Sequence, residues 1–242
     1  MIPNTFQTKV GTSPVQDIEW IVYEPTVPYN RAVVIAYGSD GLAPKWEPEI
    51  RRHAQALSAA GILALVPDYF QKKPRVAHDS SAAVFLQIPR RHGEWEIVLR
   101  DAVSTAKALP GVDAARVGLL GFSLGGFLCL RIRDSVDVLV EYFAPYRFPS
   151  GEDLSEEALV MGLGQGANPR LKAHIHHGYA DALVPLNLNA ESIRVALEAE
   201  NATVSTSYFN GANHGFAGND AANTHARDTS FDETTQFFKT YL

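Results

Sequence analysis

Short runs of consecutive apolar residues alternate along the chain with longer segments in which apolar residues recur every three or four positions. The short runs are typical of strands covered on both faces, and the longer spacing is typical of helices that pack on a sheet. Strands are predicted for residues 18–23, 32–37, 62–66, 117–121, 136–143, 173–177 and 203–209. Helices are predicted for residues 47–60, 94–109, 124–132, 188–199 and 232–241.

This alternation predicts an α/β fold, in which a mainly parallel, twisted sheet is flanked by helices on both faces. Two long, polar segments with glycine and proline interrupt it, at residues 72–93 and 145–172. Both follow predicted strands at the ends where open α/β sheets bind ligands. We therefore interpret residues 1–242 as one domain with two excursions that cover a binding site and set its specificity.

The composition is that of an ordinary globular protein, because 46% of the 242 residues are hydrophobic and 20% are charged. The net charge of −6 argues against a nucleic-acid-binding surface and gives no attraction to anionic lipid. No stretch approaches the roughly 18 apolar residues of a transmembrane helix, and the N-terminus lacks a signal-peptide pattern. We expect a cytoplasmic protein without nucleic-acid or membrane partners. The sequence leaves open whether it forms a homo-oligomer.

The strongest chemical signal is Gly-Phe-Ser-Leu-Gly at residues 121–125, which fits the pattern G-x-S-x-G. It follows a predicted buried strand and opens a predicted apolar helix, which is the setting that this pattern requires. Glycines are needed there because the serine sits on a strained turn and the flanking residues crowd together. We interpret Ser123 as a nucleophile. The alternative is a glycine-rich turn with an incidental serine.

A serine nucleophile needs a base, and the base needs an acid that orients it. His214 follows the last predicted strand, and Asp181 follows the predicted strand before it. Both are therefore expected at strand ends, as is Ser123. Glu141 lies inside a predicted strand and is a rival candidate for the acid.

Two backbone N–H groups are expected to stabilise an oxyanion beside the nucleophile. One belongs to Leu124, the residue after the serine. The second is expected in the loop after the second predicted strand, from Ser39, with the N–H of Gly38 as the neighbouring candidate. The alternative for residues 38–41 is a plain tight turn.

With serine, aspartate and histidine in this order, the sequence resembles the dienelactone hydrolase family of α/β hydrolases over nearly its whole length. The matching segments are residues 33–41, 66–70, 118–126, 177–185 and 212–217. The resemblance implies an α/β-hydrolase fold with Ser123 as nucleophile, Asp181 as acid and His214 as base. It also implies hydrolysis of small-molecule esters or lactones through an acyl-enzyme, without a cofactor.

Three positions depart from the family pattern. Ser123 stands where the founding dienelactone hydrolases have a cysteine, and Gly218 stands where they have an arginine for a substrate carboxylate. Residues 37–41 lack the glutamate that governs the thiol, and Tyr37 replaces the histidine of the H-G-S-G-G variant. We therefore expect neutral esters or lactones as substrates, unless a basic residue of the excursions replaces the arginine. Those basic residues are Lys72, Lys73, Arg75, Arg90, Arg91 and Arg147.

Other candidate residues are interpreted as packing residues. The only cysteine, Cys129, lies on the apolar helix after the serine motif, and a single cysteine excludes an intramolecular disulfide. His174 and His176 share one face of a predicted strand, and His177 follows. No carboxylate or cysteine partner is evident for them, so no metal site is expected. The aromatic residues that either line a pocket or pack in the core are Tyr37, Trp95, Tyr142, Phe143 and Tyr146.

Two other functions use the same residues or the same fold. An acyltransferase would use the same triad and pass the acyl group to an alcohol or an amine. A non-catalytic ligand-binding module predicts a broken triad, whereas all three members are present here. Dinucleotide binding is not expected, because the glycines lack the G-x-G-x-x-G order.

Overall fold

The computed structural model describes residues 2–12, 14–70, 81–149, 159–161, 163–164 and 166–242. Its centre is an eight-stranded sheet with the strand order β1-β2-β4-β3-β5-β6-β9-β10. These strands are β1 (Thr5–Thr8), β2 (Gln16–Tyr23), β3 (Ala32–Ala36), β4 (Leu63–Pro67), β5 (Val117–Phe122), β6 (Val138–Tyr142), β9 (Lys172–Gly178) and β10 (Thr203–Phe209). β2 runs antiparallel to both of its neighbours, and the strands from β4 to β10 are mutually parallel. The predicted mainly parallel sheet is confirmed.

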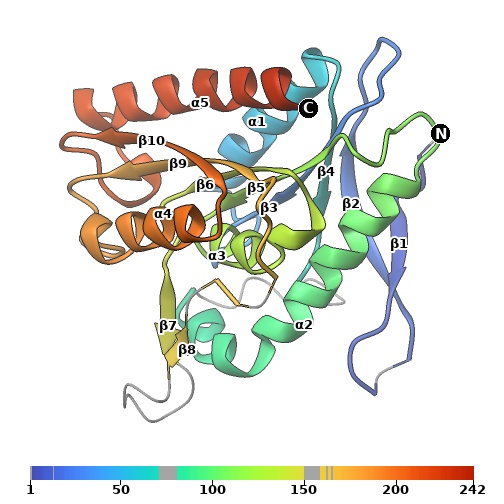
Figure 1. Cartoon of the computed structure of the whole chain (residues 1–242), viewed down its shortest axis with the longest axis horizontal. Helices are drawn as coiled ribbons and strands as arrows, with labels where there is room; N and C mark the ends of the chain where they lie inside the picture. Colours follow the sequence, from blue (N-terminus) through green and yellow to red (C-terminus); the bar gives the residue numbers. More distant parts are fainter. Residues whose placement is uncertain (1, 13, 71–80, 150–158, 162, 165) are drawn as a thin grey trace.

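Helices cover both faces of this sheet. They are α1 (Glu47–Ala59), α2 (Ser81–Ala108), α3 (Leu124–Arg131), α4 (Ala190–Ala199) and α5 (Ala221–Tyr241). Figure 1 shows α1 and α5 on one face, and α2, α3 and α4 on the other. Within the part of the chain that the structure describes, no helix has both the length and the apolar character needed to cross a membrane.

The first excursion is partly helical, which differs from the sequence-based interpretation. α2 begins at Ser81, whereas the predicted helix begins at residue 94. Pro89 and Gly93 lie inside α2, and both residue types disfavour a helix interior, so the stretch looks like a loop in the sequence. Residues 72–80, which include three of the basic residues considered above, lie outside the described residues.

The second excursion contains a small antiparallel pair of strands. β7 (Arg147–Pro149) pairs with β8 (Leu159–Met161), and neither strand is predicted from the sequence. Both strands are only three residues long, too short for an apolar periodicity to stand out. Residues 150–158 of this excursion lie outside the described residues.

α5 also begins earlier than the sequence predicts, at Ala221 instead of residue 232. Its N-terminus is capped by Asp220, whose side chain accepts a hydrogen bond of 3.0 Å from the backbone N–H of Asn223. The buried side of α5 consists mostly of small or polar residues. The buried residues are Asn223, Ala226, Ser230, Thr234 and Phe238, and of these only Phe238 is large and apolar. The first part of α5 therefore lacks the apolar period on which the sequence-based prediction rests.

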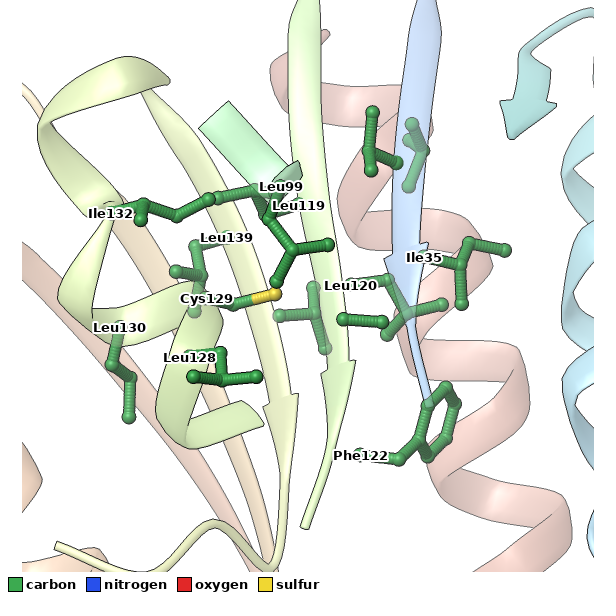
Figure 2. Close-up of a cluster of buried hydrophobic side chains, with 14 of the residues drawn as sticks. Ile35, Leu99, Leu119, Leu120, Phe122, Leu128, Cys129, Leu130, Ile132 and Leu139 are labelled. Atoms are coloured by element: carbon green, nitrogen blue, oxygen red, sulfur yellow. The ribbon is translucent and has the colours of Figure 1, made fainter. Parts of the chain in front are cut away.

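Aliphatic side chains make up a large part of the core on the α3 face of the sheet. Figure 2 shows Cys129 of α3 within this cluster, with residues of β5 and β6 around it. Cys129 is fully buried, and its burial raises the pKa of the thiol. The thiolate form is therefore disfavoured, in agreement with a packing role.

Candidate active site

Ser123 lies in the turn between β5 and α3, at the carboxyl end of a central strand. Its backbone has φ 51° and ψ −116°, a strained conformation that residues other than glycine rarely adopt. The neighbouring glycines permit this turn. A Cβ on Gly121 would lie 2.5 Å from the Cα of Gly126. A Cβ on Gly125 would lie 2.2 Å from the carbonyl oxygen of Ala36, so no side chain fits at either position.

The structure brings the three residues of the predicted triad together. His214 Nε2 lies 3.1 Å from Ser123 Oγ, and His214 Nδ1 lies 2.8 Å from Asp181 Oδ2. Asp181 follows β9, and His214 opens a short 3-10 turn, η4 (His214–Phe216), after β10. The ring of Phe143 packs against the imidazole, with 4.9 Å between the ring centroids. The imidazole therefore bridges the serine hydroxyl and the carboxylate, with one nitrogen on each.

The carboxyl group of Asp181 is fully buried and held by the backbone. Its Oδ1 accepts hydrogen bonds from the N–H groups of Leu183, at 3.0 Å, and Val184, at 2.7 Å. Burial alone would raise the pKa of Asp181, but hydrogen bonds from His177, His214 and Val184 hold that pKa well below its usual range. Asp181 therefore faces His214 as a carboxylate.

Among the described residues, Glu141, the rival candidate for the acid, forms no hydrogen bond with His214. Its Oε2 accepts a hydrogen bond of 2.8 Å from the backbone N–H of Ala144. Complete burial raises the pKa of Glu141 to about 8, against the opposing attraction of His177. Glu141 is therefore mostly neutral at pH 7, which suits a buried structural carboxyl better than the partner of an imidazolium.

The loop after β3 lies against the nucleophile turn. A Cβ on Gly38 would be 3.4 Å from the Cβ of Ser123. Ser39 and Ser123 both line the pocket described below. The Gly41 N–H donates to the Gly38 carbonyl at 3.0 Å, so residues 38–41 do form a tight turn. Leu124 begins α3, where backbone N–H groups have no partner within the helix. Both predicted oxyanion donors thus belong to segments that adjoin Ser123.

A pocket of about 810 Å³, including its open mouth, lies over Ser123 and His214. Aromatic rings form much of its wall. These rings belong to Trp46, Phe85, Phe122, Tyr142, Phe143 and Phe216. Phe85 comes from the first excursion, and Tyr142 and Phe143 are two of the predicted candidates. Tyr37 and Trp95 are buried in the core instead.

Among the residues that the structure describes, three charged ones line the pocket, and the sequence alone singles out none of them. Asp40 accepts a hydrogen bond of 2.6 Å from Trp46 Nε1, and burial raises the pKa of Glu49. Arg227 Nη1 donates to the carbonyl oxygens of Phe216, at 2.7 Å, and Gly218, at 2.9 Å. Arg227 lies on α5, nine residues after Gly218, the position at which the founding family members have an arginine. Arg227 lies 13 residues after His214, a spacing that belongs to no recognisable sequence motif.

His174 and His176 are not among the residues that line the pocket. They point from β9 toward α5, where Glu233 Oε2 lies 3.7 Å from one imidazole nitrogen of each. Burial lowers the pKa of both histidines. The sequence did not reveal this carboxylate, because a strand and a distant helix had to be packed together first. His177 points the other way, and its Nε2 lies 3.4 Å from Asp181 Oδ2.

The mainly parallel sheet, with a serine on a strained strand-to-helix turn and a histidine after the last strand, defines an α/β hydrolase. Within this class, the chain belongs to the dienelactone hydrolase family, whose model matches residues 18–242. Membership of this family supports a hydrolase. No curated protein sequence matches the chain.

Solved structures share this fold at low sequence identity. A Klebsiella pneumoniae subsp. pneumoniae protein assigned as a dienelactone hydrolase is 23% identical, with a TM-score of 0.71 and 98% of each chain covered. The dienelactone hydrolase of Anabaena variabilis is 17% identical, with a TM-score of 0.63, and the match covers 98% of this chain and 97% of that one. The acylaminoacyl peptidase of Pyrococcus horikoshii is 15% identical, with a TM-score of 0.68, and covers 98% of this chain and 41% of that one. These likenesses show the fold.

Proposed function

We propose that the protein is a serine hydrolase that cleaves carboxylic esters or lactones through an acyl-enzyme intermediate. The observation that supports this most strongly is the position of His214, which is hydrogen-bonded to Ser123 on one side and to Asp181 on the other. A histidine in this position can take the serine proton while the carboxylate fixes the ring. The proposed reaction needs no cofactor.

In the first half of the proposed reaction, Ser123 Oγ attacks the acyl carbonyl carbon while His214 Nε2 takes the hydroxyl proton. His214 then gives this proton to the leaving alkoxide, and the acyl group stays on Ser123. In the second half, His214 takes a proton from water, the resulting hydroxide attacks the acyl carbon, and the serine regains its proton. Asp181 stays ionised throughout and stabilises the imidazolium.

The proposed oxyanion donors are the backbone N–H groups of Leu124 and Ser39. The proposal is supported by the position of Leu124 at the start of α3 and by the contact of the β3 loop with Ser123. Two such donors stabilise the negative charge that develops on the carbonyl oxygen, and the loss of one typically costs about 10²–10³ in turnover.

The experiment that tests this function combines covalent labelling with ester hydrolysis. A fluorophosphonate should label the protein once, at Ser123, and small p-nitrophenyl esters should be hydrolysed. Ser123→Ala and His214→Ala should each lower turnover by several orders of magnitude. The double variant should lose little more, because members of a triad act as a unit. Ser104→Ala, at an exposed serine of α2, is the control and should retain full labelling and activity.

The outcomes separate the competing functions. Activity of Ser123→Ala at a tenth of the wild-type rate would rule out the serine as nucleophile. Absence of labelling would favour a non-catalytic binding module. If added alcohols or amines capture the acyl group in preference to water, the protein is an acyltransferase that uses the same residues.

A further inference from the structure

A second group of convergent polar side chains lies between β9 and α5, away from Ser123. His174 and His176 of β9 and Glu233 of α5 each offer one ligand atom to it, and all three atoms lie within 4.8 Å of one another. The atoms are His174 Nε2, His176 Nδ1 and Glu233 Oε2. All three are buried, and none has a hydrogen-bond partner among the described residues. Buried polar atoms rarely lack partners, so this group needs an explanation.

The hydrogen bond on the far side of His174 permits a tautomer with a free Nε2. His174 Nδ1 lies 2.6 Å from Ser205 Oγ, which also lies 3.3 Å from the carbonyl oxygen of Ala173. When the Ser205 hydroxyl donates to that carbonyl, its oxygen accepts the Nδ1 proton of His174. A neutral imidazole has only one N–H, so in this tautomer the Nε2 of His174 presents a lone pair to the group.

His176 has a matching tautomer. Its Nε2 lies 3.1 Å from Thr234 Oγ1, which lies 2.6 Å from the Tyr142 hydroxyl. The Tyr142 proton has other acceptors in the Ser230 carbonyl oxygen and His53 Nε2, so Tyr142 can accept the Thr234 hydroxyl proton. In that arrangement Thr234 accepts the Nε2 proton of His176, and the Nδ1 of His176 is a lone pair that also points into the group.

In these tautomers, two imidazole lone pairs and one carboxylate oxygen converge without a donor between them. We propose that His174, His176 and Glu233 form a binding site for a divalent transition-metal cation of the zinc type. Imidazole nitrogen and carboxylate oxygen are ligands that Zn²⁺ takes at about 2.0–2.2 Å in tetrahedral geometry. Ligand atoms of such a site are about 3.3 Å apart, close to the two 3.7 Å separations seen here.

The surroundings of the three residues fit a metal site. The outer nitrogen of each histidine is hydrogen-bonded, as metal-binding histidines usually are. His176 is fully buried, whereas the Glu233 side chain is 38% exposed and gives a hydrated ion a route from solvent. With three protein ligands, the fourth tetrahedral position is available to water. Hard cations such as Mg²⁺ prefer all-oxygen sites and should bind poorly.

An ion in this site would connect β9, the strand next to the edge of the sheet, to α5. α5 directly follows the segment that carries His214, and Thr234 links His176 to Tyr142 of the pocket wall. A ligand that binds only the folded protein stabilises it by mass action. Zn²⁺ should therefore raise the unfolding temperature and slow amide exchange in α5. This site and the proposed serine chemistry use different residues, so each can fail without the other.

The test is a calorimetric titration of EDTA-treated protein with Zn²⁺. We expect one saturable site in the wild type, and a visible absorption band when Co²⁺ replaces Zn²⁺. Glu233→Gln and His174→Gln should each weaken binding at least about 100-fold, since even outer partners of metal ligands are worth about 10–100-fold. Asp232→Asn, an adjacent exposed residue with the same charge change, should bind as the wild type does. His214→Gln should also retain binding.

Three results would overturn the proposal. One is the absence of a saturable Zn²⁺ site in the wild type. Another is equal affinity in the wild type and in both Glu233→Gln and His174→Gln, which would place the ion elsewhere on the surface. The third is loss of binding in His214→Gln alone, which would place the ion on the serine site. Circular dichroism of each variant identifies one that fails to fold, and the remaining variant then decides.

Discussion

At the scale of single residues, Asp181 and Glu141 show how two buried carboxyl groups acquire different roles. Asp181 accepts two backbone N–H bonds and faces two histidines, so its charge is compensated. Glu141 accepts one backbone N–H, and its other oxygen has no partner among the described residues. The number of donors around each group, and not the residue type, separates a carboxylate from a neutral acid.

This difference leads to a prediction for the acid of the proposed triad. Asp181→Asn should lower kcat by up to about 10⁴, because the amide favours the wrong imidazole tautomer. Glu141→Gln should change kcat by less than about tenfold, since glutamine resembles the neutral acid already present. Both variants are to be assayed on the same neutral ester. A large loss in Glu141→Gln with a mild effect of Asp181→Asn would exchange the two assignments.

At the scale of elements, the contact between β3 and the start of α3 depends on a glycine. A Cβ on Gly125 would meet the backbone oxygens of Ala36 and Tyr37 at 2.2 and 2.4 Å, and backbone cannot rotate away. Gly125→Ala should therefore separate the two elements and destabilise the fold by about 3 kcal/mol or more. Urea unfolding measures this loss.

Gly93 provides the control for that prediction. It lies inside α2, and a Cβ there would meet nothing within 4 Å. Gly93→Ala should stabilise the protein by about 0.5–1 kcal/mol, because alanine has the higher helix propensity. If both alanine substitutions destabilise the protein equally, close packing is not the reason for the glycine at position 125.

The elements also show how far a sequence alone can predict this structure. The parallel strands are predicted within one or two residues for β3, β4 and β5, because each is a continuous apolar run between turn residues. The first turns of α2 are missed because Pro89 and Gly93 lie inside the helix. The first turns of α5 are missed because the buried residues there are mostly small or polar, so no apolar helical period is visible. The periodicity of apolar residues in a sequence predicts which positions are buried only where the buried residues are themselves apolar.

The same limit applies to the candidate site. Ser123, Asp181 and His214 are found because their chain order and turn contexts are recognisable in the sequence. Arg227, Glu49 and Glu233 are missed because they enter their sites from helices, through contacts between distant elements. No local pattern records such contacts.

At the scale of the whole molecule, charge influences which substrates reach the pocket. The net charge is −6. Among the described residues, Asp40 and Glu49 line the pocket together with one cation, Arg227, which is hydrogen-bonded to carbonyl groups. A neutral ester should therefore have a kcat/KM about tenfold higher than that of the matched carboxylate, at low ionic strength. A tenfold preference for the carboxylate would contradict this prediction. Loss of that preference in Arg227→Gln would identify Arg227 as the residue that binds the substrate carboxylate.

Stability of the whole molecule should fall in mild acid because of His53. His53 is fully buried on α1, with Nδ1 on the Glu49 carbonyl and Nε2 on the Tyr142 hydroxyl, and burial lowers its pKa to about 4. The unfolded chain binds this proton below its ordinary pKa of about 6.5. The stabilising contribution is therefore complete above pH 6.5 and is lost as the pH falls toward 4.

This effect amounts to about 2 kcal/mol between pH 7 and pH 5. Urea unfolding at the two pH values should show that the wild type loses this much more stability than His53→Gln does. His225→Gln, at an exposed histidine of α5, serves as the control and should behave as the wild type. Equal losses in the wild type and His53→Gln would show that another group governs acid unfolding.

The burial of Cys129 has a practical consequence for spectroscopy. It is the only cysteine of the chain, it is fully buried, and its thiolate is disfavoured, so thiol reagents should leave the folded protein unmodified. The wild-type protein should therefore give no labelling signal of its own when a new cysteine is introduced and labelled. A single Leu183→Cys substitution, at a pocket residue with 63% exposure, should accept one maleimide dye and report ligand entry by fluorescence.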